Sequence, residues 1–449
     1  MLGIAFDIPY ICHMPTTEKI LVLTYGSRGD VEPFIALANG LAQHGHAVTL
    51  STAERYGDWV KTFGLAFEPL PDDIIDLMDT PDGKAAIEGG SVVFERVAAG
   101  FRLARKSGPL NEAQNVNAWR VAQEVQPDLI VHHPKVIAAP HIAEALDVPA
   151  VLALLQPMVV ATHEFPPAGM PNLPIPGYNR FGYSLVNLSY GSFRKSINTF
   201  RKNTLKLPPV KRRSEVLFPN GMGASKVLHA ISPAVIPRPK DWPDDATMTG
   251  YWGLKSDEDY LPPDNLRRFL EAGPPPVYIG FGSMPVKDPQ ALQQTIIDAL
   301  GKARVRGVIS TGWARFDEIE TDRILTIPSV PHSWLFPRMA AVVHHGGMGT
   351  TAQGFRAGVP CVICPFFGDQ PYWAKISVSL GVGAPSVPRG KLSADTLSAS
   401  IIAAVNGPSL RSNARSLAEQ LKNEDGLMTA IAEIENTLAN GRSQDRPFV

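Results

Sequence analysis

The residues whose types and spacing most clearly indicate chemistry lie between positions 340 and 370. An apolar run at 340–343, long enough for a buried strand, leads into the sequence HHGGMGTT and then into a short helical segment. Amides at the start of a helix lack intrahelical partners and carry partial positive charge, and glycine lets an anion approach them. We therefore predict an anion site, to which Thr350 adds a hydroxyl and His345 a ring N–H. The alternative is a structural turn, since glycine-rich turns follow strands in many α/β folds.

Polar residues also follow the next apolar run, at 359–367, which ends in Gly368, Asp369 and Gln370. With this arrangement, one loop can hold phosphates while the next holds sugar hydroxyls. Asp369 and Gln370 could instead belong to a plain turn after the strand, for which Gly368 supplies the backbone freedom.

A third candidate, Asp30, lies near the start of the chain. Residues 19–26 have the apolar composition of a buried strand, and a helix with Pro33 in its first turn is predicted to run to about residue 43. This order places Asp30 at the carboxyl end of the first strand, where open α/β sheets bind ligands. A carboxylate there can accept a proton from an attacking hydroxyl. Capping of the helix is the alternative role, compatible with the first, and Arg28 is predicted to form a structural salt bridge.

The elements that must position these residues predict an α/β protein of two domains, because 449 residues exceed what one hydrophobic core usually holds. A segment with four prolines at 233–243 is predicted to be the linker. The expected boundaries are an extension at 1–17, a first domain at 18–232, a second domain at 244–441 and a disordered tail at 442–449.

Composition argues against several classes of protein. With 42 Lys and Arg against 43 Asp and Glu, no global charge attracts nucleic acid. No apolar run reaches the ~18 residues that span a bilayer, and residues 1–14 do not have the pattern of a signal peptide. The few cysteines suit a reducing compartment, so a cytoplasmic location is expected, with Cys361 and Cys364 in the core. The acidic triplet at 257–259 is predicted to be loop surface, and no metal site is expected.

At the central stretch, HHGGMGTT followed by PFFGDQ resembles the donor-binding signature of nucleotide-sugar glycosyltransferases with the GT-B architecture. Within that group it looks most like the sterol glucosyltransferase branch. The resemblance covers nearly the whole chain, with sparse support at about 70–125 and 155–225. It implies two Rossmann-like domains whose parallel sheets face each other across a cleft, with the last helix crossing back to the first domain.

The resemblance also assigns roles in binding the donor. The diphosphate would be bound by Ser283, His345, Gly347, Gly349 and Thr350. The sugar hydroxyls would be bound by Asp369 and Gln370. The nucleoside would be bound by Trp313, Val330 and Gln353.

Two of the nucleoside assignments rest on departures from the plant relatives. Those relatives stack a tryptophan on uracil where this chain has Ser329, which cannot stack, so Trp313 is the predicted replacement. Trp334 is a second candidate, although its apolar surroundings indicate core packing. Gln353 falls where the plant relatives bind the ribose with a glutamate, so the identity of the nucleotide stays open.

On the acceptor side, many relatives carry a catalytic histidine at the position of Asp30, whereas the sterol and antibiotic glucosyltransferase branches carry aspartate. The plant relatives orient that histidine with an aspartate close to the place of His133. Asp30 and His133 could therefore form a reversed catalytic pair. The alternative for His133 is a loop histidine that faces solvent or acceptor.

Together these features predict an inverting glycosyltransferase that moves glucose from UDP-glucose to a sterol or similar hydrophobic alcohol and forms a β-glucoside. No cofactor and no metal are expected, because protein dipoles and an imidazole can stabilise the leaving diphosphate. A polyketide, terpenoid or glycolipid acceptor, or a dTDP-sugar donor, is the close alternative. An epimerase or a binding protein on the same fold is a more distant one.

The resemblance implies that residues 158–217 contribute to the acceptor pocket. They are rich in proline and aromatic residues, and a flat lipophilic alcohol needs an apolar pocket with few polar groups. Basic clusters follow at 194–195, 201–202 and 211–213. They could rest on an anionic membrane surface that supplies such an acceptor, or they could simply be a solvated helix face. The sequence does not predict the oligomeric state.

Overall fold

The computed structural model describes residues 17–80, 93–254, 260–282, 284, 288–312 and 316–445. Three predictions lie outside the described residues: the diphosphate ligand Ser283, the stacking residue Trp313 and the acidic triplet at 257–259. Nearly all of the predicted extension at 1–17 also lies outside them.

The first half of the molecule is built on a seven-stranded parallel sheet with the order β3-β2-β1-β4-β5-β6-β7. Its strands are mostly continuous apolar runs, as expected for a parallel sheet that is covered on both faces. They are β1 (Lys19–Leu23), β2 (Ala47–Ala53), β3 (Ala66–Leu70), β4 (Leu129–His132), β5 (Ala150–Leu154), β6 (Lys226–His229) and β7 (Ala246–Met248).

The seventh strand corrects the predicted domain boundary. β7 pairs with β6, so residues 233–243 connect two strands of one sheet and are not the linker between the domains. The segment contains four prolines, but Trp242 packs into the core and Arg238 donates hydrogen bonds to the backbone around it. The passage to the second half therefore follows Met248.

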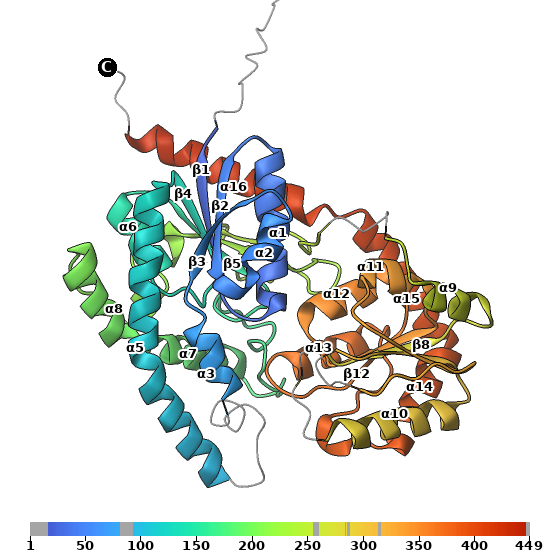
Figure 1. The fold of residues 1–449 in the computed structure, drawn as a ribbon. Helices are drawn as coiled ribbons and strands as arrows, with labels where there is room; N and C mark the ends of the chain where they lie inside the picture. The colour runs from blue at the N-terminus through green and yellow to red at the C-terminus, as the bar shows by residue number, and fades with distance from the viewer. Residues whose placement is uncertain are drawn as a thin grey trace, which may run out of the picture.

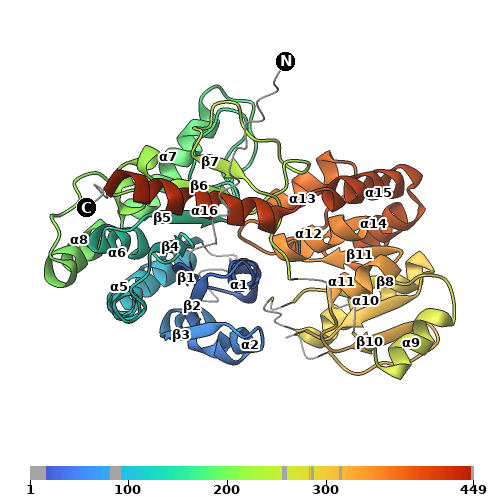
Figure 2. The same cartoon turned by 90° about the horizontal axis from the view of Figure 1, so that it is seen from above.

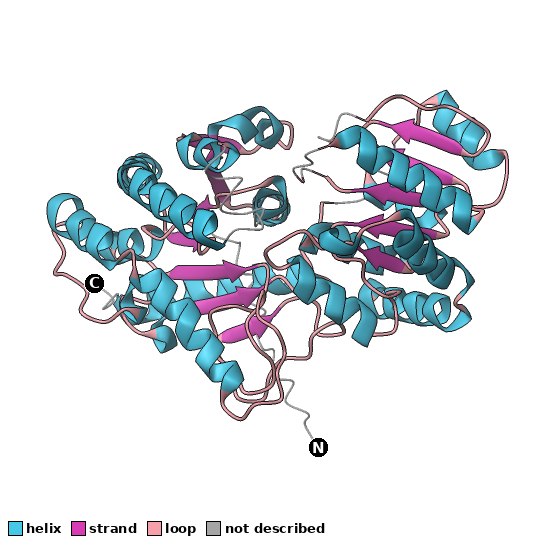
Figure 3. Ribbon diagram, turned by 90° about the horizontal axis from the view of Figure 1, so that it is seen from below, coloured by secondary structure: helices cyan, strands magenta, loops and turns pink. Residues whose placement is uncertain are grey.

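Helices cover both faces of this sheet (Figure 3). They are α1 (Arg28–Gln43), α2 (Gly57–Lys61), α3 (Asp73–Asp79), α5 (Val93–Val125), α6 (Ala139–Leu146), α7 (Tyr178–Gly191) and α8 (Arg194–Phe200). Helix α1 begins at Arg28, five residues before Pro33, which lies inside the helix. The prediction that Pro33 is in the first turn was therefore wrong, because Ser27 and Asp30 form the cap earlier in the chain.

The second half contains a five-stranded parallel sheet with the order β10-β9-β8-β11-β12. Its strands are β8 (Val277–Gly280), β9 (Gly307–Ser310), β10 (Ile324–Ile327), β11 (Ala341–His344) and β12 (Cys361–Ile363). Its helices are α9 (Asp264–Glu271), α10 (Pro289–Ala303), α11 (His332–Leu335), α12 (Met348–Ala357), α13 (Gln370–Ser379), α14 (Ala394–Asn406) and α15 (Pro408–Lys422). The predicted α/β fold with two parallel sheets is confirmed.

The last helix, α16 (Gly426–Asp445), returns to the first half and packs along α1 (Figure 1). Ile431 is buried and would contact any side chain placed at Gly40 of α1, and Glu433 pairs with Lys226 at the start of β6. Since α16 continues to Asp445, the predicted start of a disordered tail at residue 442 was wrong.

The two halves share one buried apolar cluster. It runs from Trp242 of the first half through Tyr251 of the connection to Tyr372 and Trp373 of α13. Viewed from above, α13 and α12 lie on the side of the second half that adjoins the first (Figure 2). The loops that follow β1 and β4 are thereby held close to the loops that follow β11 and β12.

Candidate active site

Asp30 occupies the first turn of α1, directly after β1. Its Oδ2 atom accepts hydrogen bonds from the backbone N–H of Ser27 at 2.7 Å and from the Ser27 hydroxyl at 2.9 Å. These contacts are the capping role that the sequence left open for this residue. Nearby, Arg28 forms the predicted local salt bridge, with its Nε 3.1 Å from Glu32 Oε2.

Lys135 is the main functional candidate that sequence reasoning missed. Its Nζ lies 2.8 Å from Asp30 Oδ2, because β4 is the sheet neighbour of β1 and the two loops leave the sheet at the same edge. The lysine side chain is half exposed, whereas that of Asp30 is mostly buried.

A glycine makes room for this ion pair. A Cβ atom at Gly26 would lie 2.3 Å from Asp30 Oδ2 and 2.8 Å from Lys135 Nζ, and the φ of Gly26 is +137°. Only glycine fits there without moving the pair. The glycine at the end of the first predicted strand, together with HHPK at the end of β4, was the available sequence signal for Lys135.

His133 lies beside Asp30, as predicted. Its Nε2 is 3.7 Å from Asp30 Oδ1, and its ring packs edge-on against Phe34. The Lys135 backbone N–H donates to His133 Nδ1 at 3.3 Å, which assigns the ring proton to Nε2. Burial lowers the pKa of His133 to about 3, so the ring is neutral and presents an N–H toward the carboxylate.

The environment of Asp30 sets its charge. Burial alone raises the pKa of this carboxyl, but Lys135, His133 and the Ser27 backbone N–H outweigh it and hold the pKa below its ordinary value. Asp30 is therefore an ionised carboxylate at neutral pH. Its Oδ2 atom already accepts three hydrogen bonds or ion contacts, so Oδ1 is the atom placed to receive another proton.

In the second half, His344 is the last residue of β11 and His345 follows it, and the two histidines have different surroundings. His344 is fully buried, and its Nδ1 accepts the Gly346 N–H at 3.1 Å, which fixes the turn. The ring of His345 lies between the loop at Gly282 and the start of α12, and burial lowers its pKa to about 4. A Cβ atom at Gly347 would lie 2.6 Å from His345 Nε2, so glycine is required for the ring to occupy this position.

The start of α12 has the geometry of the predicted anion site. Gly347 is the N-cap, and the next amides, including those of Gly349 and Thr350, belong to the first turn. The second threonine of the stretch, Thr351, is buried and donates to the Gly347 carbonyl within the helix. Gln353, predicted to bind the ribose, lies one turn after Gly349 and is therefore on the same side of α12.

Asp369 and Gln370, the predicted sugar ligands, differ in how their side chains are used. Asp369 Oδ2 accepts the indole N–H of Trp373 at 2.9 Å. Burial raises the pKa of Asp369, although the Trp373 bond opposes this. Gln370 is buried, and its Oε1 accepts the backbone N–H groups of Phe366 and Phe367 at 2.7 and 3.1 Å.

Gln370 thus forms the internal turn that was the alternative reading. Its Nε2 lies 3.3 Å from Met284 Sδ, in the loop after β8, so the side chain links two loops of the second half. A direct contact of Gln370 with a sugar stays a prediction.

The two halves approach each other at these residues. Asp369 is close enough to Asp30 and Lys135 for their charges to affect its pKa. The Gly368 carbonyl lies 3.5 Å from the Cβ position of Gly169, in the loop before α7. A ligand between the halves would therefore meet an ionised carboxylate on one side and the α12 amides, His345 and Asp369 on the other.

The nucleoside region is only partly described. Val330 is buried just before α11, and its backbone role stays a prediction. Trp334 packs against Tyr260 and carries the Arg338 guanidinium 4.1 Å above its ring, which agrees with the packing role given as its alternative.

Two further features were checked as sites. Among the described residues, no group of three or more His, Cys, Asp or Glu could hold a metal ion. Cys361 and Cys364 are free and buried, which confirms the core assignment, and burial raises the pKa of each thiol to about 12.

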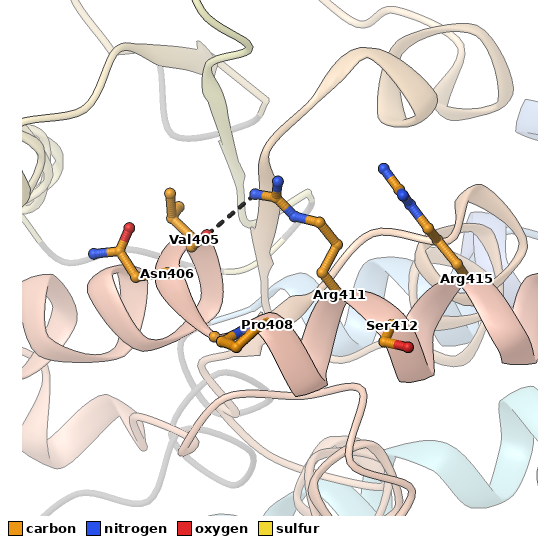
Figure 4. Close-up of a pocket in the computed structure, with 7 residues that line it drawn as sticks. Val405, Asn406, Pro408, Arg411, Ser412 and Arg415 are labelled. Atoms are coloured by element: carbon orange, nitrogen blue, oxygen red, sulfur yellow. Dashed lines mark hydrogen bonds between the residues drawn. The ribbon is translucent and has the colours of Figure 1, made fainter.

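A pocket of about 400 Å³ lies where α14 meets α15, away from every predicted site residue (Figure 4). Arg411 in this pocket donates to the Val405 carbonyl at 3.1 Å, so it satisfies the carboxyl end of α14. The pocket is the junction of two helices and contains none of the groups described above.

Similarity to known proteins extends over most of the chain. Residues 20–162 match the family model of the glycosyltransferase family 28 N-terminal domain, and residues 317–434 match that of the erythromycin biosynthesis protein CIII-like C-terminal domain. A solved glycosyltransferase of kitacinnamycin is 17% identical, with a TM-score of 0.67, over 94% of this chain and 100% of that one. The glycosyltransferase VinC, solved in complex with dTDP, is 18% identical, with a TM-score of 0.63, over the same shares. At these identities the likeness shows the fold, and the predicted GT-B architecture is confirmed.

Curated relatives are closer in sequence. Sterol 3-beta-glucosyltransferase UGT80A2 of Arabidopsis thaliana is 35% identical over 95% of this chain and 66% of its own length. UGT80B1 of the same plant is 34% identical over 92% of this chain and 67% of its own length. The Yarrowia lipolytica sterol 3-beta-glucosyltransferase is 36% identical over 98% of this chain but only 30% of its own length. The chain thus spans about two thirds of the plant relatives and under a third of the fungal one. Given this identity and coverage, the chain belongs to the sterol 3-beta-glucosyltransferase family.

Proposed function

We propose that this chain transfers glucose from UDP-glucose to the hydroxyl of a sterol, in one displacement that inverts the anomeric configuration. The proposal rests on the presence of two complementary sets of groups. The first half contributes the ionised Asp30, and the second contributes the amides of α12, His345 and Asp369. The printed names of the relatives supply the sugar and the acceptor class.

Asp30 acts as the general base. The acceptor hydroxyl donates to Oδ1, because Ser27 and Lys135 occupy Oδ2. As the hydroxyl oxygen attacks the anomeric carbon, its proton moves to Asp30. The neutral His133 lies beside the same Oδ1 atom, with its Nε2 3.7 Å away. Lys135 keeps Asp30 ionised before the acceptor arrives.

Leaving-group stabilisation comes from the second half. Negative charge grows on the β-phosphate as the bond to the sugar breaks. The Gly349 and Thr350 amides and the His345 N–H, fixed before the reaction, are suited to meet that charge. Asp369 accepts hydrogen bonds from sugar hydroxyls, and activity without added metal is expected.

An assay with radiolabelled sugar nucleotides tests the proposal. The full chain is incubated with UDP-glucose or dTDP-glucose and with a panel of sterols, polyketides, terpenoids and diacylglycerol, with and without EDTA. We expect labelled β-glucoside from UDP-glucose and a sterol, unchanged by EDTA. Glucoside formed only on another acceptor class, transfer only from dTDP-glucose, or activity that EDTA abolishes and Mn²⁺ restores would each contradict the corresponding part of the proposal.

The location of the acceptor matters for this function. None of the helices in the described part of the chain has the length and apolar character needed to cross a lipid bilayer. Contact with a membrane surface, predicted from the basic clusters, is therefore a separate proposal and depends on a surface that can be named.

A further inference from the structure

The segment around α7 has a charge distribution unlike the rest of the chain. Residues 165–214 contain nine Lys and Arg and no Asp or Glu, whereas the whole chain has a net charge of −1. Eight of the nine cations are exposed, and the ninth, Arg201, is buried in an ion pair with Glu144. The segment therefore presents positive charge without internal neutralisation.

Large apolar side chains are exposed in the same segment. Of the ten exposed large hydrophobic residues among those described, five lie between positions 173 and 188. Phe181, Leu185 and Leu188 follow one another at helical spacing along the outer side of α7, with exposed fractions of 58%, 39% and 44%. Leu173 and Ile175 extend the patch into the preceding loop. We call these five residues the α7 patch.

The cations gather next to this patch. Arg213 lies against Gly191, the last residue of α7, and Arg194 donates to the Lys211 carbonyl. The adjacent carboxylate of Glu215 accepts the backbone N–H groups of Lys211 and Arg212, and its Oε1 lies 3.9 Å from Arg212 Nε, so one carboxylate faces five cations. A basic cluster therefore borders the carboxyl end of the patch. Its members are Arg194, Lys195, Lys211, Arg212 and Arg213.

We propose that the α7 patch docks on an anionic lipid bilayer, with its apolar side chains at the level of the headgroups and the basic cluster on lipid phosphates. One helix face of large apolar residues flanked by cations is the pattern of interfacial helices. Nucleic acid would leave the apolar side chains exposed to water. Figure 2 shows α7 at the periphery of the first half.

The opposite side of α7 connects this surface to the proposed site. Tyr183 is buried there, close enough to Tyr372 of α13 for the two phenols to interact. Gly182 packs against Pro167 and Met170, in the loop whose Gly169 approaches Gly368. One helix thus separates the docking surface from the residues that bind the donor. This inference rests on the proposed function only in that a sterol would be a substrate delivered from the bilayer.

Vesicle sedimentation with the full chain tests the surface. Phosphatidylcholine vesicles with and without 30% phosphatidylserine are compared for the wild type, for Phe181→Ser/Leu185→Ser/Leu188→Ser and for Lys211→Glu/Arg212→Glu/Arg213→Glu. The control is Leu261→Ser/Ile402→Ser/Met428→Ser, which removes three exposed apolar side chains elsewhere. We expect the wild type and the control to bind anionic vesicles, and both α7 variants to bind at least ten-fold more weakly. Thermal melting curves show whether each variant is folded.

The outcomes separate the surface from the activity. Binding that neither variant weakens, or no binding of the wild type to either vesicle, overturns the docking proposal. Loss of self-association, rather than of vesicle binding, in the serine variant would assign the patch to a contact between copies and also overturn it. Glucosylation of detergent-dispersed sterol by the wild type tests the proposed function separately. Vesicle binding without any glucosylation by the wild type would support docking and contradict the function.

Discussion

The two halves of the molecule have the same strand order around their sites but differ in the charge of the groups placed there. The order β3-β2-β1-β4-β5 in the first half corresponds to β10-β9-β8-β11-β12 in the second, and in each case the site lies where the order reverses. In the first half this position holds a charged pair, Asp30 and Lys135. In the second it holds a helix start and a neutral histidine.

The two carboxylates make the difference concrete. The pKa of Asp30 is lowered because burial is outweighed by the Lys135 cation and by the hydrogen bonds that the carboxylate accepts, whereas the pKa of Asp369 is raised because burial dominates. Environments that move two carboxyl pKa values apart give those groups different tasks. We infer that Asp30 serves as a charged base beside the acceptor, while Asp369 serves as a hydrogen-bonding group beside the sugar.

Exchanging the two carboxylates for amides is the strongest way to test this comparison. Asp30→Asn removes the proton acceptor, so kcat is expected to fall ~10²- to 10⁴-fold while UDP affinity, measured by calorimetry, stays within about two-fold. Asp369→Asn should mainly raise the KM for the donor. If Asp30→Asn kept near-normal turnover and Asp369→Asn abolished it, the roles would be reversed.

The role of the second half, where the site histidine is neutral, is tested by substitution of His345. His345→Ala removes an N–H that would meet a charged phosphate, a bond worth ~1.5–3 kcal/mol, so the donor Kd should increase ~10- to 100-fold in calorimetry with UDP. His163→Ala, which changes an exposed histidine of the first half, is the matched control. Unchanged donor affinity and turnover in His345→Ala would remove the imidazole from the leaving-group site.

A pair of glycines tests whether the position of that imidazole matters. Gly347→Ala places a methyl group 2.6 Å from His345 Nε2 and so displaces the ring, whereas the Cβ position at Gly349 is in open space. We expect Gly347→Ala to weaken UDP binding about ten-fold, on the order of the loss of one hydrogen bond, and Gly349→Ala to change it little. If the two substitutions weakened UDP binding equally, the position of the His345 ring would not explain the requirement for glycine.

The smallest expected effect concerns Lys135 and is a shift in pH dependence. The lowered pKa keeps Asp30 ionised as the pH falls, so activity on the acid side should persist until the pH reaches that pKa. Lys135→Met leaves the burial but removes the opposing charge, so the pKa of Asp30 rises and the acid limb of kcat/KM should move to higher pH. Lys135→Arg keeps the charge and should keep the limb in place. An unshifted limb in Lys135→Met would show that the lysine does not tune the base.

Sequence reasoning predicted the site best where parallel strands dictate it. The proximity of Asp30 and His133 was predicted from the resemblance, and it arises because the two residues follow strands that are neighbours in the sheet. Lys135 was missed, because the contact of its ammonium group with Asp30 depends on the conformations of the two loops, which the glycine and the HHPK sequence indicate only indirectly. The orientation of Gln370 toward its own loop likewise depends on side-chain contacts, which a pattern of residue types does not contain.

The predicted domain boundary was wrong for a related physical reason. Strand β7 has only three residues and follows a proline-rich segment, so its local sequence resembles a linker. Its strand character comes from pairing with β6 and from the burial of Trp242 in the shared core. Tertiary packing of this kind outweighs local preference and is not visible in a short window.

The return of α16 to α1 means that the first half is discontinuous in the sequence. It consists of the segment that ends after Met248 together with the last helix, whose Ile431, Ile434 and Leu438 are buried. Each of these side chains contributes ~1.5–3 kcal/mol through burial. A fragment that stopped after β7 would leave the matching face of α1 exposed to water. Separate expression of the acceptor half therefore requires residues 426–441 to be supplied, either fused in a permuted chain or added as a peptide.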